Sequence, residues 1–473
     1  MLSNKRLVVV CVVAFLSNIT LLALFVKYNI GEKYFISIDH QHVSVILPDS
    51  YLSIGIDASE IQDFHKIDFS KERFHDLAAF CPSLKKLCRH KFLPFFIMTG
   101  PKWKEINNFC KSSGLKLMFP LNVLLRDEHE WNQQNAVELL KYSKENKFDI
   151  DWQLGNEPNS FRHVFNKSIS PHNLAQDFKK LRKLLNQTGY KDSLLVGPDT
   201  TRPQPHQPNC LKYMVEFLGN ASHYINVRSW HQYYLNSRTA NLDDFWNPDT
   251  FDLLDNQIQT MKNHTSKYIN IPMWLTETSS SYGGGAPGLS NSYAGTPLWL
   301  DKLGLAARHN ITTVVRQSFY GGNYSLIDQK LEPLPDWWLS VLYKKLVGNK
   351  VLHLKSHSSR FQRVYAHCAN RKYTNDTTAI TIYAINLKME KVKFLLNGTA
   401  LQGDKLVIDE YILSVPSNNR RSKTLLLNGW PLYYESSLPD FQPHQHINSN
   451  HITMSPYSVG FWVIKNTSIK ICK

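Results

Sequence analysis

The chain has few cysteines, and none of them lies in a Cys-x-x-Cys or Cys/His pattern. They are Cys11, Cys81, Cys88, Cys110, Cys210, Cys368 and Cys472. Zinc sites built on such patterns are therefore not predicted. The glycine run at 283–285 is not followed by Lys-Ser/Thr, which excludes a phosphate-binding loop of the P-loop type. We expect neither a metal ion nor a cofactor.

The chain also lacks tandem repeats and low-complexity tracts. Its 473 residues are 42% hydrophobic and 20% charged, which is the composition of a folded protein. That length exceeds one ordinary domain, and it would accommodate a barrel of about 250–300 residues with a smaller module.

Acidic residues are scarce relative to basic ones. The 39 Asp and Glu residues are outnumbered by 54 Lys and Arg residues, so the net charge is +15. A basic surface favours a polyanionic partner, and nucleic acid, an acidic membrane and a sulfated glycan would each fit. Charge alone does not choose among these three.

The N-terminus narrows the choice. Lys5 and Arg6 precede a largely apolar run at residues 7–26, and Lys27 follows it. This is the pattern of a cleaved signal peptide or of a retained single-pass membrane anchor, and both interpretations stay open. Either one sends the chain into the secretory pathway, toward the extracellular matrix or the lysosome. Nucleic acid is then not the expected partner.

Glycosylation sequons agree with that compartment. Asn-x-Ser/Thr sites beyond the leader occur at Asn166, Asn186, Asn220, Asn263, Asn310, Asn323, Asn375, Asn397 and Asn466. We expect glycans at all of them except Asn323, which falls among the candidate site residues named below. Disulfides are the default state of cysteine in an oxidising compartment.

Short apolar runs recur along the first two thirds of the chain, with helix-like stretches between most of them. The runs cover residues 52–56, 93–97, 115–119, 150–154, 194–196, 224–230, 272–275 and 313–315. Residues 136–142 and 174–185 place apolar side chains three and four positions apart, as in an amphipathic helix. Eight strand–helix repeats predict an α/β fold, a (β/α)8 TIM barrel.

From about residue 351 the pattern changes to strands separated by turns. Strand-like segments cover 363–367, 378–385, 392–396, 405–412, 423–427 and 459–464. They predict a C-terminal all-β sandwich domain, which we expect an early strand at 42–47 to join. The expected organisation is a leader at 1–27, an N-terminal segment at 28–50, a catalytic barrel at 51–348 and a sandwich at 349–473.

Two glutamates follow the fourth and seventh predicted strands. Glu157 lies in the run Leu-Gly-Asn-Glu-Pro-Asn, and Glu277 lies in Leu-Thr-Glu-Thr-Ser. Barrel active sites form at the C-terminal ends of the strands, and strands four and seven face each other across the ring. Glycosidic bond cleavage needs one carboxyl to give a proton to the leaving oxygen and another to attack or stabilise the sugar cation. Glu157 and Glu277 are therefore candidate catalytic residues of a glycosidase.

Other polar residues also follow predicted strands. They are Asp57, Asn122, Asn156, Asp199, His231, Tyr233 and Gln317. Asn156 suits a donor to a sugar hydroxyl or to the nucleophile. Tyr233 suits a donor to the nucleophile carboxylate, although barrel packing also explains a tyrosine there. The glycine run at 283–285 would let backbone N–H groups approach a ligand, or it would form a flexible loop.

Longer motifs make the sequence recognisable. Residues 151–161, 230–240 and 277–287 resemble the heparanase family closely, and so do 299–305 and 322–324. The resemblance runs from about residue 50 to the C-terminus. It implies a barrel with a β-sandwich that works as a retaining endo-β-glucuronidase on heparan sulfate, with Glu157 as acid/base and Glu277 as nucleophile.

The resemblance also implies binding residues and a partner. With His231, Arg202 and Gln204 added, the expected substrate-binding set is Asp57, Asn156, Arg202, Gln204, His231, Tyr233, Arg238, Gly283, Gly284, Gln317, Gly322 and Tyr324. The family implies a disulfide between Cys368 and Cys472, and a second one from Cys110 to Cys88 or Cys81. The implied partner is heparan sulfate on proteoglycans, and we expect a monomer.

Three features depart from the family. The linker that heparanases lose on activation is absent, because residues 98–102 lead almost directly into the next helix, so we expect activity without linker excision. The same segment lacks an arginine of the second strand, and residues 202–204 exchange Arg and Gln. Lys102, Lys104 and Arg202 would restore the positive charge. A non-catalytic heparan sulfate-binding protein on this scaffold and an exo-β-glucuronidase stay open as alternatives.

Overall fold

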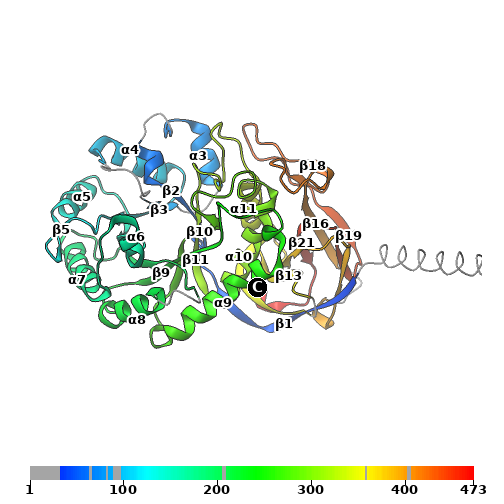
Figure 1. Cartoon of the computed structure of the whole chain (residues 1–473). Coiled ribbons are helices and arrows are strands. Elements are labelled where there is room, and N and C mark those ends of the chain that lie inside the picture. The colour runs from blue at the N-terminus through cyan, green and yellow to red at the C-terminus, as the bar shows by residue number, and fades with distance from the viewer. Residues whose placement is uncertain are drawn as a thin grey trace, which may run out of the picture.

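Two β-sheets organise the computed structural model, which describes residues 32–62, 67–80, 84–88, 97–204, 209–356, 359–401 and 406–473. A parallel sheet surrounded by helices forms one side of the molecule, and a mixed sheet forms the other (Figure 1). The fold is of the mixed α/β class, as predicted.

The parallel sheet has eight strands in the order β3-β2-β11-β10-β9-β8-β7-β4. Their bounds are β2 (Leu52–Asp57), β3 (Leu84–Cys88), β4 (Leu117–Leu121), β7 (Ile150–Leu154), β8 (Leu195–Thr200), β9 (Val227–Asn236), β10 (Met273–Tyr282) and β11 (Ile311–Gln317). The end strands β3 and β4 lie side by side, so the sheet curls into a barrel of the TIM type. This confirms the predicted barrel architecture.

Helices cover the outside of this sheet (Figure 1). They are α2 (Ala58–Gln62), α3 (Glu72–Ala79), α4 (Gly100–Ser112), α5 (Gln134–Glu145), α6 (Phe161–Phe165), α7 (Pro171–Gln187), α8 (Asn209–Ala221), α9 (Pro248–His264), α10 (Thr296–Arg308) and α11 (Pro335–Leu346). The stretches predicted at 136–142 and 174–185 lie within α5 and α7. In α7, Leu174, Phe178 and Leu181 are fully buried, which is why that spacing forms a helix here.

The second strand of the barrel differs from the prediction. The strand paired with β2 is β3, in the segment Leu-Lys-Lys-Leu-Cys, and not the apolar run at 93–97. Residues 93–96 lie outside the described residues, and Ile97 is not in a strand. The run at 93–97 is more apolar than β3, which carries two lysines, and the prediction was therefore wrong at this strand.

The mixed sheet has eleven strands, most of them antiparallel. They are β1 (Glu32–Ile46), β12 (Val347–Ser356), β13 (Gln362–Ala369), β14 (Ile380–Asn386), β15 (Val392–Leu396), β16 (Val407–Ser414), β17 (Leu426–Leu427), β18 (Trp430–Pro431), β19 (His444–Ile447), β20 (His451–Met454) and β21 (Val459–Lys465). Strand β1 pairs antiparallel with β12 and parallel with β15, so the segment before the barrel is part of this sheet.

One core holds this second unit together. Phe394 of β15 and Ile452 of β20 share a buried cluster with Ile382 of β14 and Trp462 of β21. The sheet therefore folds over itself, and its two walls enclose a core as in a sandwich. The two walls belong to one continuous hydrogen-bonded sheet, a point that the strand pattern alone did not reveal.

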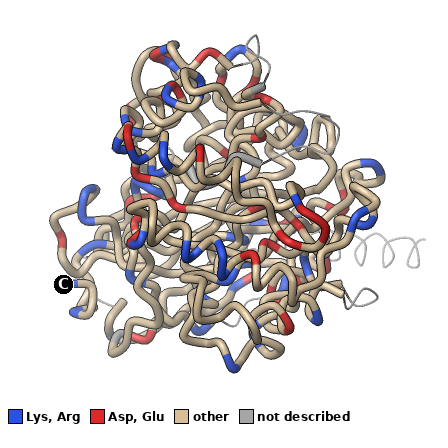
Figure 2. The backbone as a smooth tube through the Cα atoms, turned by 90° about the vertical axis from the view of Figure 1, so that its left-hand side faces the viewer, with Lys and Arg blue, Asp and Glu red and all other residues tan. Residues whose placement is uncertain are grey.

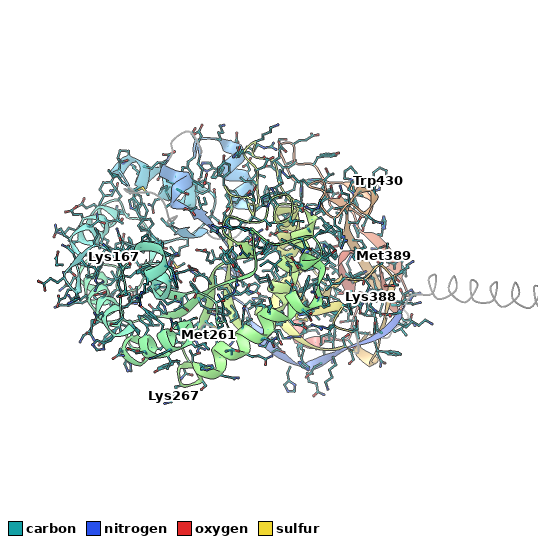
Figure 3. All side chains as sticks on the ribbon, in the orientation of Figure 1. Lys167, Met261, Lys267, Lys388, Met389 and Trp430 are labelled. Atoms are coloured by element: carbon teal, nitrogen blue, oxygen red, sulfur yellow. A yellow bond between two sulfur atoms is a disulfide. The ribbon has the colours of Figure 1, made fainter. Side chains whose placement is uncertain are left out.

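Charged pairs join the two units. Arg363 of β13 lies 2.9 Å from Asp301 of α10 and 2.7 Å from Asp252 of α9. Asp301 is fully buried, so its charge needs this partner. Lys388, labelled in Figure 3, lies 2.9 Å from Glu32 at the start of β1. The Arg363 contacts fix the mixed sheet against the barrel helices, whereas the Lys388–Glu32 pair ties two segments of the mixed sheet together.

The expected disulfide between Cys368 and Cys472 is present. Cys110 is a buried free thiol, so the second bridge that the family resemblance implied is not formed in this structure. Within the described ranges, no helix combines the length and the apolar character that a membrane crossing requires, and the leader lies outside those ranges.

Candidate active site

Glu157 leaves the end of β7 through a sharp turn. Gly155 has φ of +82°, and a Cβ atom there would lie 2.8 Å from the Val123 side chain. Glu157 itself has φ of +52°, a left-handed conformation that costs free energy for a residue other than glycine. Its backbone N–H donates to the carbonyl of Asp199 on β8 at 3.0 Å. The turn thus aims the Glu157 carboxylate across the ends of the strands.

Glu277 is presented by a bulge in β10. Leu275 pairs with Trp230 and Glu277 pairs with His231, so β10 carries one extra residue, Thr276, at this point. A bulge rotates the side chains that follow it. The Thr276 hydroxyl donates to the Asp199 carboxylate at 2.5 Å, which holds the extra residue in place.

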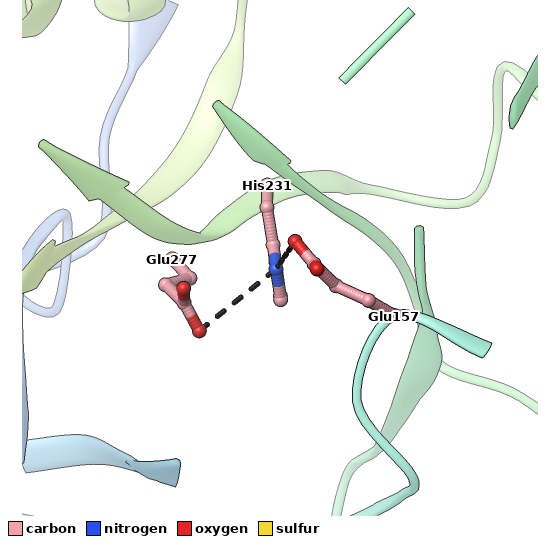
Figure 4. Close-up of side chains that lie close together, drawn as sticks. All are labelled: Glu157, His231 and Glu277. Carbon is pink, nitrogen blue, oxygen red and sulfur yellow. Dashed lines mark hydrogen bonds and ion pairs between the residues drawn. The ribbon is translucent and has the colours of Figure 1, made fainter. Parts of the chain in front are cut away.

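The two glutamates and His231 converge at the barrel mouth (Figure 4). One donor atom from each of the three residues lies within 4.8 Å of the donor atoms of the other two. The two carboxylates therefore approach each other to within 4.8 Å. Carboxylate and imidazole donors at this spacing are also the group that would hold a metal ion, although we expected none.

His231 is buried between three carboxylates. Its Nδ1 atom lies 2.8 Å from Oε1 of Glu157 and 3.8 Å from Oε2 of Glu277. Its Nε2 atom lies 3.4 Å from Oδ2 of Asp199. The buried Asp199 carboxylate favours the tautomer with hydrogen on Nε2. Nδ1 can then accept a hydrogen bond from a protonated Glu157 carboxyl at 2.8 Å.

Tyr233 supports the other glutamate. Its hydroxyl donates to Oε1 of Glu277 at 2.8 Å, which favours the ionised carboxylate. The Tyr233 ring stacks on Tyr324 with 6.5 Å between ring centroids. Arg202 donates to the Tyr233 carbonyl at 2.7 Å and lies over the ring of Tyr282. Burial lowers the pKa of Arg202, while contacts with Tyr282 and Glu157 oppose that shift.

Two buried amide oxygens at the strand ends have no hydrogen-bond partner among the described residues. They are Oδ1 of Asn156, next to Glu157, and Oε1 of Gln317, at the end of β11. Buried polar atoms are nearly always satisfied in folded proteins, so an exception calls for an explanation. Both atoms are closed to solvent in this structure, so these side chains would have to turn before a bound sugar could reach them.

The glycine run forms a tight backbone loop beside the site. Gly283, Gly284 and Gly285 all have left-handed φ values, between +79° and +90°. A Cβ atom on Gly285 would lie 2.7 Å from the backbone of Asn323. The N–H of Asn323 donates to the Gly284 carbonyl at 2.7 Å, which ties this loop to the Gly322–Tyr324 segment. The glycines are needed for this close approach.

The remaining predicted residues are placed less closely. Asp57 ends β2 and accepts hydrogen bonds from Ser59. Gln204 is half-buried and Arg238 is exposed, and no contact joins either of them to the two glutamates among the described residues. Lys102 does not supply free positive charge to the mouth, because its side chain is buried and lies 3.0 Å from Glu105.

Two supporting residues of the site do not stand out in the sequence. Its pattern marks Asp199 only as a polar strand end and does not mark Thr276. Asp199 has φ of +60° and accepts from Thr276, so both shape the bulges that carry the site. The one available signal was the position of Thr276 directly before Glu277.

Positively charged residues are not confined to one segment of the barrel side. Figure 2 shows Lys and Arg at many places along the chain on the barrel side, with acidic residues among them. All nine sequon asparagines beyond the leader are exposed, and Lys167 of the first sequon lies at the outer side of the barrel in Figure 3.

The sequence is similar to glycoside hydrolases of one family. The profile of glycosyl hydrolase family 79, N-terminal domain, matches residues 80–304. Heparanase of Bos taurus is 40% identical over 77% of this chain and 67% of its own. Inactive heparanase-2 of Homo sapiens is 34% identical over 80% and 66% of the two chains. Hyaluronoglucuronidase of Hirudo nipponia is 33% identical over 78% and 77%.

Solved structures agree on the fold. A family 51 α-L-arabinofuranosidase from Bifidobacterium longum superposes with a TM-score of 0.69 at 11% identity, covering 92% of this chain and 99% of its own. A 4-O-α-L-rhamnosyl-β-D-glucuronidase from Fusarium oxysporum superposes with a TM-score of 0.65 at 13% identity, covering 91% and 99%.

Proposed function

Because the chain belongs to glycosyl hydrolase family 79, alongside the heparanases, and is a glycoside hydrolase, we propose that it is a retaining endo-β-glucuronidase acting on heparan sulfate. One observation carries the proposal: the carboxylates of Glu157 and Glu277 come within 4.8 Å of each other. Retaining glycosidases hold their carboxyl groups about 5–5.5 Å apart, whereas inverting enzymes need about 6.5–9.5 Å to fit a water molecule.

The exposure of the two glutamates supports their roles. The Glu277 side chain is 15% exposed and accepts from Tyr233, which suits an ionised nucleophile. The Glu157 side chain is 30% exposed and lies against Nδ1 of His231, which suits a proton donor that reaches the leaving group and later a water molecule. We therefore assign Glu157 as acid/base and Glu277 as nucleophile.

The reaction proceeds in two displacements. In the first, Glu277 forms a bond to the anomeric carbon, the glycosidic C–O bond breaks, and the proton of Glu157 goes to the leaving oxygen. In the second, water attacks the anomeric carbon, Glu157 takes a proton from it, and the Glu277 carboxylate is released. His231 and Tyr233 hold the two carboxyl groups.

Heparan sulfate is the substrate that the charge favours. The net charge of +15 attracts a sulfated polyanion more strongly than an unsulfated glycan. Arg202 beside Tyr233 and the backbone N–H groups of the 283–285 loop are the candidate contacts for its acidic groups. Hyaluronan, the alternative raised by the hyaluronoglucuronidase of Hirudo nipponia, lacks sulfate and is the discriminating comparison substrate.

We also propose activity without excision of a linker. The connection from Cys88, at the end of β3, to Gly100, at the start of α4, spans only residues 89–99. Thr99 caps α4 directly by accepting from the N–H of Lys102. This short connection supports a cleft that is open in the unprocessed chain.

We place the protein in the secretory pathway, as a monomer that is secreted, lysosomal or anchored by residues 7–26. The Cys368–Cys472 disulfide and the exposed sequon asparagines support an oxidising, glycosylating compartment.

The test measures chain length. Purified residues 28–473 are incubated with heparan sulfate and with hyaluronan, with and without protease, and the products are sized by gel filtration. We expect heparan sulfate to shorten to mid-sized fragments without protease. Disaccharide-sized or monosaccharide products alone would indicate exo-cleavage, and activity only after proteolysis would contradict the single-chain proposal.

The inactive relative makes a non-catalytic binding protein the alternative to exclude. Glu157→Gln and Glu277→Gln should each abolish cleavage while binding to immobilised heparin is retained. If wild type and both variants bind equally and none of the three cleaves, the protein is the binding protein.

A further inference from the structure

A buried lysine sits behind the strands that carry the site. Lys302 of α10 is 1% exposed. Its Nζ atom donates to the Ser279 carbonyl at 2.9 Å, to the Gln232 carbonyl at 3.4 Å and to the Thr278 hydroxyl. It also lies 4.5 Å from the centre of the Tyr234 ring. An ammonium group has three N–H donors, and three oxygens surround this one.

These acceptors lie one residue away from the site residues. Gln232 is between His231 and Tyr233 on β9, and Thr278 directly follows Glu277 on β10. The Thr278 hydroxyl in turn donates to the Gln232 carbonyl. Because side chains alternate along a strand, contacts behind Gln232 and Thr278 fix the direction in which their neighbours point into the mouth.

The bulge explains why such a tether is needed. The extra residue in β10 interrupts its pairing with β9 between Leu275 and Glu277, and with β11 between Leu275 and Thr278. A bulge locally disrupts the ladder hydrogen bonds that would otherwise hold Glu277 in place. Lys302 contacts both strands directly after the bulge, where the ladder resumes.

Burying the charged Lys302 side chain costs free energy, which argues against a role in packing alone. Burial lowers the pKa of Lys302 well below its usual value, Arg316 and Arg202 add repulsion, and Asp336 and Asp301 offset only part of it. Its hydrogen-bond acceptors are uncharged oxygens. An apolar side chain would fill this place at lower cost.

Resting on the proposed function, we propose that Lys302 is a positioning residue that fixes β9 to β10 after the bulge and so sets the contact between Tyr233 and Glu277. It does not touch substrate. Its loss should therefore slow the chemistry and leave substrate binding nearly intact.

The variants are Lys302→Met, Thr278→Val and Thr278→Ser. Lys302→Met removes the amine with little change of volume. Thr278→Val removes one acceptor and keeps the lysine, whereas Thr278→Ser keeps the hydroxyl and is the conservative rescue. Lys262→Met is the matched control, because Lys262 is a half-buried lysine of α9 that donates to the His309 carbonyl, away from the mouth.

We expect Lys302→Met and Thr278→Val to lower kcat about 10- to 100-fold, as small misplacements of reacting groups do, with KM within about twofold. The rate of covalent labelling of Glu277 by a 2-deoxy-2-fluoro-glucuronide should fall in parallel. Thr278→Ser and Lys262→Met should behave like wild type in both measurements.

Wild-type kcat and labelling rate in Lys302→Met, or a loss of thermal stability with full activity of the folded protein, would overturn the proposal. If Lys302→Met fails to fold, the Thr278→Val and Thr278→Ser pair decides by the same readouts. If wild type itself neither cleaves nor is labelled, the proposed function has failed. A crystal structure of Thr278→Val then still reports whether the separation of Tyr233 and Glu277 has changed, and an unchanged separation overturns the inference.

Discussion

The Nδ1 atom of His231 lies 2.8 Å from the Oε1 atom of Glu157, and the opposite ring nitrogen faces the buried carboxylate of Asp199. Asp199 thus orients the imidazole that faces Glu157, the proposed acid/base. It also accepts from Thr276, so one carboxylate links β8 to the bulge of β10. Both candidate catalytic groups depend on this residue.

Asp199→Asn should lower kcat by at least about tenfold, because an amide can turn its N–H toward Nε2 and favour the wrong tautomer. The fall should appear in steady-state rates on heparan sulfate. Asp192→Asn, the same change at an exposed position, is the control and should keep wild-type rates. Unchanged rates in Asp199→Asn would remove Asp199 from the mechanism.

Tyr233→Phe should lower kcat about 10- to 1000-fold, the range seen when one donor to a reacting oxygen is removed. The variant loses the 2.8 Å hydrogen bond to Glu277 and keeps the ring stacked on Tyr324. Tyr234→Phe is a matched control. Its buried hydroxyl has no partner among the described residues, so its removal should leave activity intact. Equal rates in the two variants would count against a role for the Tyr233 hydroxyl.

Acid should weaken the mixed sheet through His367. Burial lowers the pKa of His367 to about 4, and its neutral ring bonds to the Gly348 carbonyl and the Tyr383 hydroxyl. A histidine in the unfolded chain titrates near pH 6.5, so between about pH 6.5 and 4 the unfolded state binds the extra proton. The stability that this group contributes is therefore complete above pH 6.5 and declines as the pH falls, by about 3 kcal/mol in total.

His367→Gln tests this pH dependence. The variant should be less stable than wild type at pH 7.5, and the gap in Tm should narrow at pH 4.5 because the variant has no proton to gain. Other acid-sensitive groups affect both proteins alike. A gap that stays constant between the two pH values would assign the acid sensitivity to other groups.

Removing the Cys368–Cys472 disulfide should destabilise the mixed sheet by about 2–5 kcal/mol, because the bridge closes a long loop. Cys472→Ser and reduction of wild type should lower Tm by similar amounts. Reductant should have no further effect on Cys368→Ser, which serves as the control for other thiol chemistry. An additional fall in that variant would point to a second bridge.

The barrel and the main candidate site residues could be predicted from the sequence. Polar residues that follow apolar strand runs point to the mouth of a barrel, which singles out Glu157, His231 and Glu277, although β9 and β10 continue to Asn236 and Tyr282, beyond the predicted strand ends. The bulge at Thr276 and the left-handed turn at Asp199 are not found in this way, since no residue pattern distinguishes them from regular strand. Lys302 could not be predicted from the sequence, because a lysine in a helix is normally exposed. Only the structure shows that α10 is packed on both faces.

The last prediction concerns the sequon at the mouth. Asn323 is exposed, and its backbone N–H holds the Gly284 carbonyl, so a glycan there would stand over the loop beside the site. We expect a peptide map of the secreted protein to show Asn323 unmodified and the other eight sequons modified. Asn323→Gln should then change neither glycan mass nor activity, with Asn310→Gln as the control that loses one glycan. Occupancy at Asn323 in active enzyme would mean that the substrate enters the mouth from another direction.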